Sequence, residues 1–247
     1  MLGITLGDPN GVGPEILIRS FMQKDLPGDV VVIGDYDIVR FCMNYLKLNV
    51  PLARIRSVKD MEPGRLNILD QGCMKETDLS IGKISEKGGG ASLKYIEIAT
   101  ELALSGEIDA IITLPVHKEA VRLVHKDFRG HTDHIATLCG VNHFTMMLVS
   151  DRLIVTHISM HVSMKEAIDK ISIPNILEVI RLTHRIGNAV VGLLSLPAQI
   201  STKSCPRTEP RDFHSLRSSE AQDGVATNAT SFALRVVVLR HRNEVLS

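Results

Sequence analysis

Short apolar runs alternate with longer amphipathic segments over the first two thirds of the chain. The apolar runs are rich in β-branched residues, which favours buried strands; they are residues 4–6 (ITL), 30–33 (VVVI), 110–113 (AIIT), 146–149 (MMLV) and 153–158 (LIVTHI). Tyr36–Leu46 and Ser92–Ser105 carry apolar residues at helical spacing, and Gly106 offers a left-handed cap to the second segment. This alternation predicts an α/β fold with a mostly parallel sheet and helices on its faces.

The pattern changes after residue 194. Residues 195–247 contain a single glycine and six arginines to one lysine, whereas the two basic residues are nearly equal in number before them. The one apolar run is residues 233–242 (ALRVVVLRHR), and the rest shows neither a helical nor a strand period. We expect a poorly packed tail. Its composition resembles coding sequence read in another frame, with an ordinary variable C-terminus as the alternative.

The overall composition is that of a folded, water-soluble protein. The 247 residues include 28 Lys+Arg and 28 Asp+Glu, and 44% of them are hydrophobic, which is too apolar for intrinsic disorder. This length allows one large α/β domain or two smaller ones. A net charge of zero gives no electrostatic reason to expect nucleic acid or an anionic membrane as a partner.

The sequence shows no signal for membrane insertion, secretion or disulfide formation. No stretch approaches the ~20 apolar residues of a membrane span, and the first residues lack the basic start and apolar run of a signal peptide. The four cysteines include no CxxC pair, so the sequence indicates neither a zinc cage nor a disulfide framework. We therefore expect a cytoplasmic protein.

A glycine-rich turn, residues 7–16 (GDPNGVGPEI), follows the first predicted strand. Glycines at a strand-to-helix turn let backbone N–H groups face a phosphate. The pattern is neither a Walker loop nor GxGxxG, so a tight structural turn is an equal alternative. In the first case, Asp8 and Glu15 are polar groups of a ligand site. In the alternative, Asp8 is a turn residue and Glu15 is an acid in the first turn of the following helix.

Two further clusters follow the 110–113 strand. Residues 113–121 (TLPVHKEAV) place Lys118 just beyond the strand end, where α/β proteins bind ligands. Lys118 is either a partner for an anionic substrate or a solvated lysine. Residues 129–136 (RGHTDHIA) hold several donors and acceptors in one turn, which favours a polar ligand-binding turn. In the alternative, Thr132 or Asp133 caps a helix.

The fourth cluster is residues 155–168 (VTHISMHVSMKEAI), a strand that leads to a helix at Met164. Either His157 or His161 is a candidate metal ligand at a strand end, although a hydrogen-bonded structural histidine is the commoner case. Three other histidines lie outside the four clusters, and we expect surface or structural roles for them: His125, His143 and His184.

Taken together and in this order, the four clusters resemble the 4-hydroxythreonine-4-phosphate dehydrogenase (PdxA) family over residues 1–190. The VTHISMHVSM form is more similar to the branch that acts on D-threonate or D-erythronate 4-phosphate than to the pyridoxine (vitamin B6) branch. The resemblance implies an isocitrate/isopropylmalate-dehydrogenase-like two-domain fold and a homodimer. It divides the chain into residues 1–135, 136–194 and a non-family tail, 195–247.

The resemblance also implies a reaction. A secondary alcohol on a phosphorylated hydroxy acid would be oxidised by NAD, and the resulting β-keto acid would lose CO₂. A divalent metal (Zn, Mg, Mn or Co) would assist. His131 and Thr132 match the family's substrate-binding pair, with Asp8 and Lys118 as further cleft contacts. His161 matches the first of three metal-binding histidines, and no catalytic residue is assigned.

The sequence departs from the family in two places. Asp133 stands where glutamate is usual. More importantly, nothing after Gly192 matches the segments that carry the second and third metal histidines and the remaining substrate contacts. The expectation is a C-terminally truncated or frameshifted dehydrogenase, with an incomplete fold, exposed sheet edge and little or no turnover. A non-catalytic protein that binds a phosphorylated metabolite is the alternative.

Overall fold

A computed structural model describes residues 1–26, 29–141, 144–149, 153–160, 162–194 and 235–238. Its main feature is a six-stranded sheet in the order β3-β4-β2-β1-β5-β8, in which every pairing is parallel except that of β5 with β8. The strands are β1 (Leu2–Thr5), β2 (Val30–Gly34), β3 (Leu52–Ile55), β4 (Leu66–Asp70), β5 (Ala110–Thr113) and β8 (Arg235–Val238). The predicted α/β fold with a mostly parallel sheet is confirmed.

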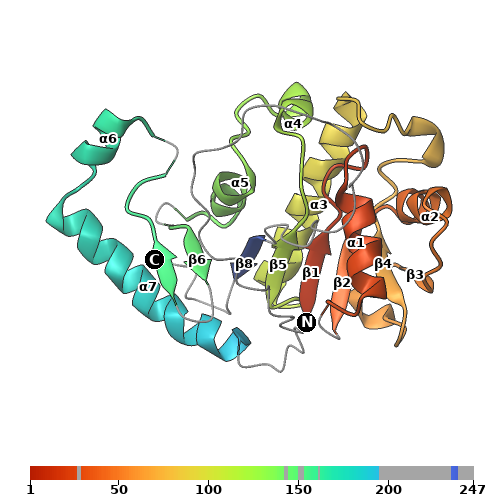
Figure 1. Ribbon diagram of the computed structural model, residues 1–247, viewed down its shortest axis with the longest axis horizontal. Helices are drawn as coiled ribbons and strands as arrows, with labels where there is room; N and C mark the ends of the chain where they lie inside the picture. The colour runs from red at the N-terminus through yellow and green to blue at the C-terminus, as the bar shows by residue number, and fades with distance from the viewer. Residues whose placement is uncertain (27–28, 142–143, 150–152, 161, 195–234, 239–247) are drawn as a thin grey trace, which may run out of the picture.

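Helices follow the strands (Figure 1). They are α1 (Gly13–Met22), α2 (Tyr36–Tyr45), α3 (Glu86–Ser105), α4 (Lys118–Val124) and α5 (His131–Leu138), with short 3₁₀ turns η1 (Val58–Asp60) and η2 (Glu76–Asp78). The helices α2 and α3 contact the sheet, α1 packs with α2, and α4 and α5 pack on α3. Along the sheet, the connection from β1 to β2 runs toward the β3 edge, whereas the connection from β4 to β5 runs toward the β8 edge. Right-handed crossovers therefore place α1 and α3 on opposite faces of the sheet.

A second group of elements lies beside this sheet (Figure 1). It consists of β6 (Met147–Val149), β7 (Ile154–Thr156), α6 (Met164–Asp169) and α7 (Ile173–Leu194). β6 and β7 form a separate antiparallel ribbon, with Met147 opposite Thr156. The Thr183 hydroxyl donates to the Thr156 hydroxyl across 3.1 Å and so ties α7 to β7. The predicted division at residue 135 stays a prediction.

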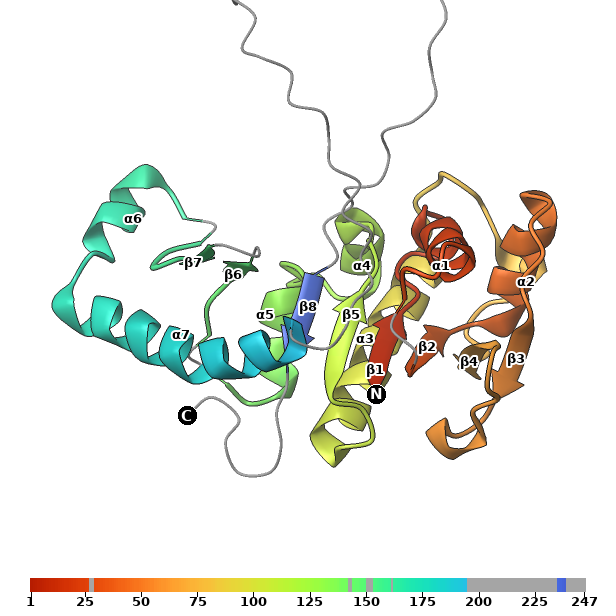
Figure 2. The same cartoon turned by 60° about the horizontal axis from the view of Figure 1, so that its bottom comes forward.

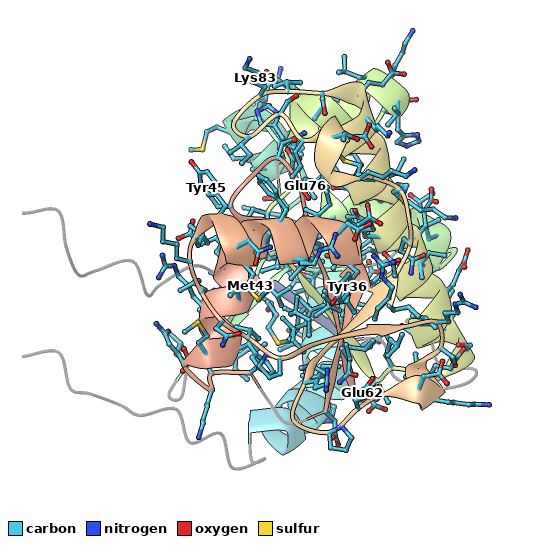
Figure 3. All side chains as sticks on the ribbon, turned by 90° about the vertical axis from the view of Figure 1, so that its right-hand side faces the viewer. Tyr36, Met43, Tyr45, Glu62, Glu76 and Lys83 are labelled. Carbon is cyan, nitrogen blue, oxygen red and sulfur yellow. The ribbon has the colours of Figure 1, made fainter. Side chains whose placement is uncertain are left out.

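The core is built on strands that are buried on both faces. All five residues of β2 and all four of β5 are buried, which explains their unbroken apolar sequences. The strands β3 and β4 were not predicted, because polar residues interrupt them. Arg54 in β3 pairs with Asp37 at 2.7 Å and lies 4.5 Å over the ring of Tyr36, at the start of α2 (Figure 3).

One charged group lies deep in this core. Asp35, 1% exposed, accepts hydrogen bonds from the Tyr95 hydroxyl at 2.7 Å and from two backbone N–H groups, of Cys73 at 2.9 Å and of Met74 at 2.6 Å. Burial raises the pKa of Asp35, while these three donors oppose the rise. The carboxylate thus joins β2, α3 and the loop after β4.

The tail differs from its expectation in the part that the structure describes. β8 pairs with β5 in antiparallel register, with Val238 opposite Ala110 and Arg235 opposite Thr113. The expected poor packing of the tail stays a prediction. The expectation of an open edge is wrong for β5, because β8 pairs along that edge, and β8 is then the outer strand of the sheet. The physical reason is that three consecutive valines have high strand propensity and meet an unpaired strand edge. The other tail residues lie outside the described ones.

The two ends of α3 can be compared with the ends predicted from the sequence. Gly106 caps α3 with a left-handed φ of 78°, as predicted, but α3 starts at Glu86 rather than Ser92. The helix begins early because Ser85 is its N-cap and accepts from the Gly88 N–H at 3.0 Å. Among the described residues, no helix is both long and apolar enough to cross a membrane.

Candidate functional site at the carboxyl ends of β1 and β5

The loops that leave β1 and β5 lie against each other. The Asp8 N–H donates to the Pro115 carbonyl at 2.9 Å, and the Leu114 N–H donates to the Thr5 carbonyl at 3.3 Å. Figure 2 shows α1 and α4, which follow these loops, near the same end of the sheet. This is the edge at which parallel α/β sheets bind ligands.

Close backbone packing, both beside the turn after β1 and against the loop after β5, explains two of its glycines. Gly7 has a φ of +73°, and a Cβ there would lie 2.4 Å from the Pro115 carbonyl oxygen. A Cβ at Gly13 would lie 2.2 Å from the Leu6 carbonyl oxygen. These two glycines therefore fit a tight turn without a phosphate, whereas Gly11 is exposed.

The acids of this turn behave differently from each other. Asp8 is buried and accepts from the Asn10 N–H at 2.9 Å, as a turn residue does. Burial raises the pKa of Asp8, and the Asn10 N–H and the nearby His117 lower it. Asp8 therefore serves the turn and also faces the loop after β5. Glu15 pairs with Arg19 at 2.7 Å on the surface of α1, which supports its reading as a helix acid.

Asn10 is a positioning residue that the sequence analysis did not identify. Its side chain donates to the Ser85 hydroxyl at 2.9 Å and accepts from the Ser80 N–H at 2.7 Å. Its carbonyl accepts from the Gly82 N–H at 2.8 Å. Asn10 thus ties the loop before α3 to the glycine-rich turn. In the sequence, the one signal for this role is the position of Asn10 within the glycine-rich turn.

The loop after β5 ends at His117, whose Nδ1 accepts from the Ala120 N–H at 3.4 Å and so caps α4. Lys118 is the exposed first residue of that helix. Its ammonium nitrogen would lie 3.8 Å from a Cβ on Gly130. Within the described residues Lys118 takes part in no ion pair. Its charge therefore lies beside the start of α5.

The helix α5 carries the predicted substrate-binding pair in its first turn. Its N-cap is Gly130, at a φ of 154° and without a side-chain cap. The alternative that Thr132 or Asp133 caps the helix is therefore wrong, because the N-cap already lies at Gly130, two residues before Thr132. His131 is 8% exposed and Thr132 is half-buried. The structure thus brings Lys118 next to Gly130, the residue that precedes His131 and Thr132.

His125 is exposed, in agreement with the expected surface role, but its ring also contacts a second histidine. Its ring centroid lies 5.3 Å from that of His134 in an edge-to-face contact. The two residues are nine positions apart, and the turn between α4 and α5 brings them together. His184 is exposed on α7, and His143 lies outside the described residues.

The predicted metal-binding strand is described only in part. His157 follows β7, and its N–H donates to the Met146 carbonyl at 3.3 Å. α6 begins at Met164, as predicted, with Ser163 as the cap. His161 lies outside the described residues. Among the residues that are described, no three His, Cys, Asp or Glu side chains gather closely enough to hold a metal ion, so these residues alone do not form a metal site.

Comparison with known proteins decides the family. The family model described as pyridoxal phosphate biosynthetic protein PdxA matches residues 27–194. The chain belongs to the PdxA family. It is 34% identical over 183 residues to a D-threonate 4-phosphate dehydrogenase from Salmonella typhimurium, covering 72% of this chain and 56% of the relative. It is 32% identical over 191 residues to a 4-hydroxythreonine-4-phosphate dehydrogenase from Beijerinckia indica, covering 76% and 56%.

Solved structures of the PdxA family agree with this. A 4-hydroxythreonine-4-phosphate dehydrogenase from Klebsiella pneumoniae has a TM-score of 0.72 and 32% identity, covering 77% of this chain and 59% of that one. A terephthalate 1,2-cis-dihydrodiol dehydrogenase from Burkholderia xenovorans shares the fold at a TM-score of 0.55 and 21% identity. The resemblance found in the four clusters is confirmed. The chain spans just over half the length of the curated relatives it matches.

Proposed function

We propose that the chain takes part in NAD-dependent oxidation of a phosphorylated hydroxy acid, such as 4-phosphohydroxy-L-threonine, D-threonate 4-phosphate or D-erythronate 4-phosphate. The observation that carries this proposal is the position of Lys118 beside the first turn of α5, in a member of the PdxA family. Relatives of this family are named as dehydrogenases of such substrates. The substrate is doubly anionic or more, so a cation beside hydrogen-bonding side chains suits it.

In this proposal, each residue of the site has a separate role in binding the substrate. Lys118 attracts a carboxylate or phosphate group, and His131 and Thr132 hydrogen-bond the polar substrate. The backbone bond from the Asp8 N–H to the Pro115 carbonyl holds the two loops together. NAD, when bound, would accept the hydride of the secondary alcohol while a base takes its proton, which would give a ketone. The β-keto acid then releases CO₂, and its bonding electron pair forms the enolate.

A divalent metal would supply Lewis-acid stabilisation of the alkoxide and the enolate. The described residues do not form a site for it, so no step above depends on it. We propose His161 as one ligand for Zn, Mg, Mn or Co. Because the family's other two metal histidines have no match in this chain, the test is metal analysis of a fusion to the C-terminal part of the Salmonella typhimurium relative, with and without His161→Ala. Equal metal content in both proteins would contradict it.

Substrate binding gives the sharpest test of the site. We expect Lys118→Ala to weaken binding of D-threonate 4-phosphate by about 10- to 100-fold, because a charged hydrogen bond contributes roughly 1.5–3 kcal/mol. Titration calorimetry measures this. Lys126→Ala, an exposed lysine beyond the end of α4, is the matched control and should bind normally. Equal loss in both variants would contradict a specific role for Lys118.

Activity is tested by NADH formation with each substrate, NAD and divalent metal. We expect this chain alone to bind substrate but turn over slowly. A fusion to the C-terminal part of the Salmonella typhimurium relative should form NADH faster, and His131→Ala should abolish the gain. Saturable binding without NADH from either protein would favour the non-catalytic alternative. A homodimer is also proposed from the family, and light scattering of the purified chain tests it.

A further inference from the structure

The contact between His125 and His134 joins the end of α4 to the first turns of α5. The two ring centroids lie 5.3 Å apart with planes at 67°, and His134 also lies 5.7 Å from the ring of Phe128. Phe128 is 1% exposed and packs with Ile135 and Val121 in a small second core. His134 therefore covers the core that attaches α5 to α4 and α3.

The surroundings of His134 favour an uncharged ring. Its Nε2 is buried and has no hydrogen-bond partner among the described residues. The groups that face it are His125 at the end of α4 and Glu97 on α3. The Glu97 carboxylate also forms an ion pair with the Lys94 ammonium, 3.8 Å away. The Nε–H of Arg122 donates to the Phe128 carbonyl at 3.0 Å.

We propose that His125 and His134 form a proton-sensitive latch, which holds α5 on α4 near neutral pH and releases it in mild acid. With both rings neutral, the edge-to-face contact packs as an aromatic pair. A proton on either ring introduces a charge against its neighbour, and on His134 it also creates a charged ring whose buried Nε2–H has no acceptor.

The direction of the pH dependence follows from these contacts. Burial, and then His125, lower the pKa of His134 below its ordinary value of 6.5, and Glu97 opposes them. A detached α5 binds the proton more readily than the attached one. Attachment is therefore strongest above pH 6.5 and is lost as the pH falls below it. At one pH unit below its ordinary pKa, one such histidine can lower the equilibrium constant for attachment of α5 by up to about tenfold.

The latch acts on the helix that carries the candidate site. α5 begins with His131 and Thr132, so its release would move them away from Lys118. This consequence for substrate binding rests on the proposed function. The latch itself rests on the ring contacts and on the burial of the His134 Nε2, and it can be tested without any substrate.

Hydrogen exchange of the intact chain at pH 7.5 and 5.5, corrected for intrinsic exchange rates, tests the latch. We expect protection of residues 131–138 to fall severalfold at pH 5.5, relative to α2 as an internal reference. His134→Phe, which keeps a ring against Phe128 but takes no proton, should remove the difference. His184→Gln, an exposed histidine of α7, should leave it unchanged.

The proposal fails if α5 and α2 respond equally to pH in the wild-type chain, or if His134→Phe shows the wild-type response. Should His134→Phe not fold, His125→Gln replaces it: loss of the neighbouring charge should reduce the response, and an undiminished response would contradict the latch. D-Threonate 4-phosphate binding at both pH values separates the two proposals. Absence of binding at either pH overturns the proposed function but not an exchange result that shows the latch.

Discussion

Gly89→Ala is expected to lower the free energy of unfolding by about 3 kcal/mol, the upper end of the usual range for overpacking. A Cβ at Gly89 would lie 2.0 Å from the Ala120 carbonyl oxygen and 2.3 Å from its carbon. Both atoms belong to the backbone of α4, so no side chain can rotate away. The helices α3 and α4 would have to separate, and α4 carries Lys118.

The neighbouring glycine provides the control. A Cβ at Gly90 would meet only a Val124 methyl at 3.8 Å, an ordinary contact. Gly90→Ala should therefore keep or raise stability, by up to about 1 kcal/mol from helix propensity. Urea unfolding of the three proteins measures the difference. Similar midpoints for the two variants would show that α3 and α4 do not approach closely at Gly89.

Asp35→Asn is expected to cost about 2–4 kcal/mol of stability. Asp35 accepts from the Tyr95 hydroxyl and from two backbone N–H groups in the core. An amide keeps the shape of the side chain, but its NH₂ group faces donors, which leaves buried donors unsatisfied at about 1–3 kcal/mol each.

Asp37→Asn, two residues further on, is the matched control. Asp37 pairs with Arg40 at 3.1 Å and Arg54 at 2.7 Å, all of them partly exposed. Such ion pairs contribute roughly 0–1 kcal/mol. Thermal or urea unfolding should separate the two variants clearly. If both lose the same stability, the network around Asp35 is not what holds β2 to α3.

The parts of the fold that follow from local sequence were predictable. β2 and β5 are unbroken apolar runs because helices cover both faces of the sheet, and Gly106 marks the end of α3 because only glycine adopts its φ cheaply. β3 and β4 were not predictable in this way. The polar side chain of Arg54 lies in a strand because an acid and an aromatic ring from α2 receive it.

The candidate site shows the same division. Motif order identified Lys118, His131 and Thr132, but not that the ammonium of Lys118 reaches the start of α5. The roles of Asn10 and of the His125–His134 pair depend on contacts between segments, which a single sequence does not display. The position of β8 is also long-range, since a valine run predicts a strand but not its partner.

The pairing of β8 with β5 has a consequence for the order in which the sheet is made. Five strands come from residues 1–113, and their last neighbour begins at residue 235. At about 5–20 residues per second, a ribosome needs roughly 6–24 s to make the intervening chain. Throughout that interval β5 presents an open edge on an otherwise assembled sheet. Before β8 emerges, β5 is therefore the strand on this side that another chain could pair with, and a chaperone that shields β5 would act in this interval.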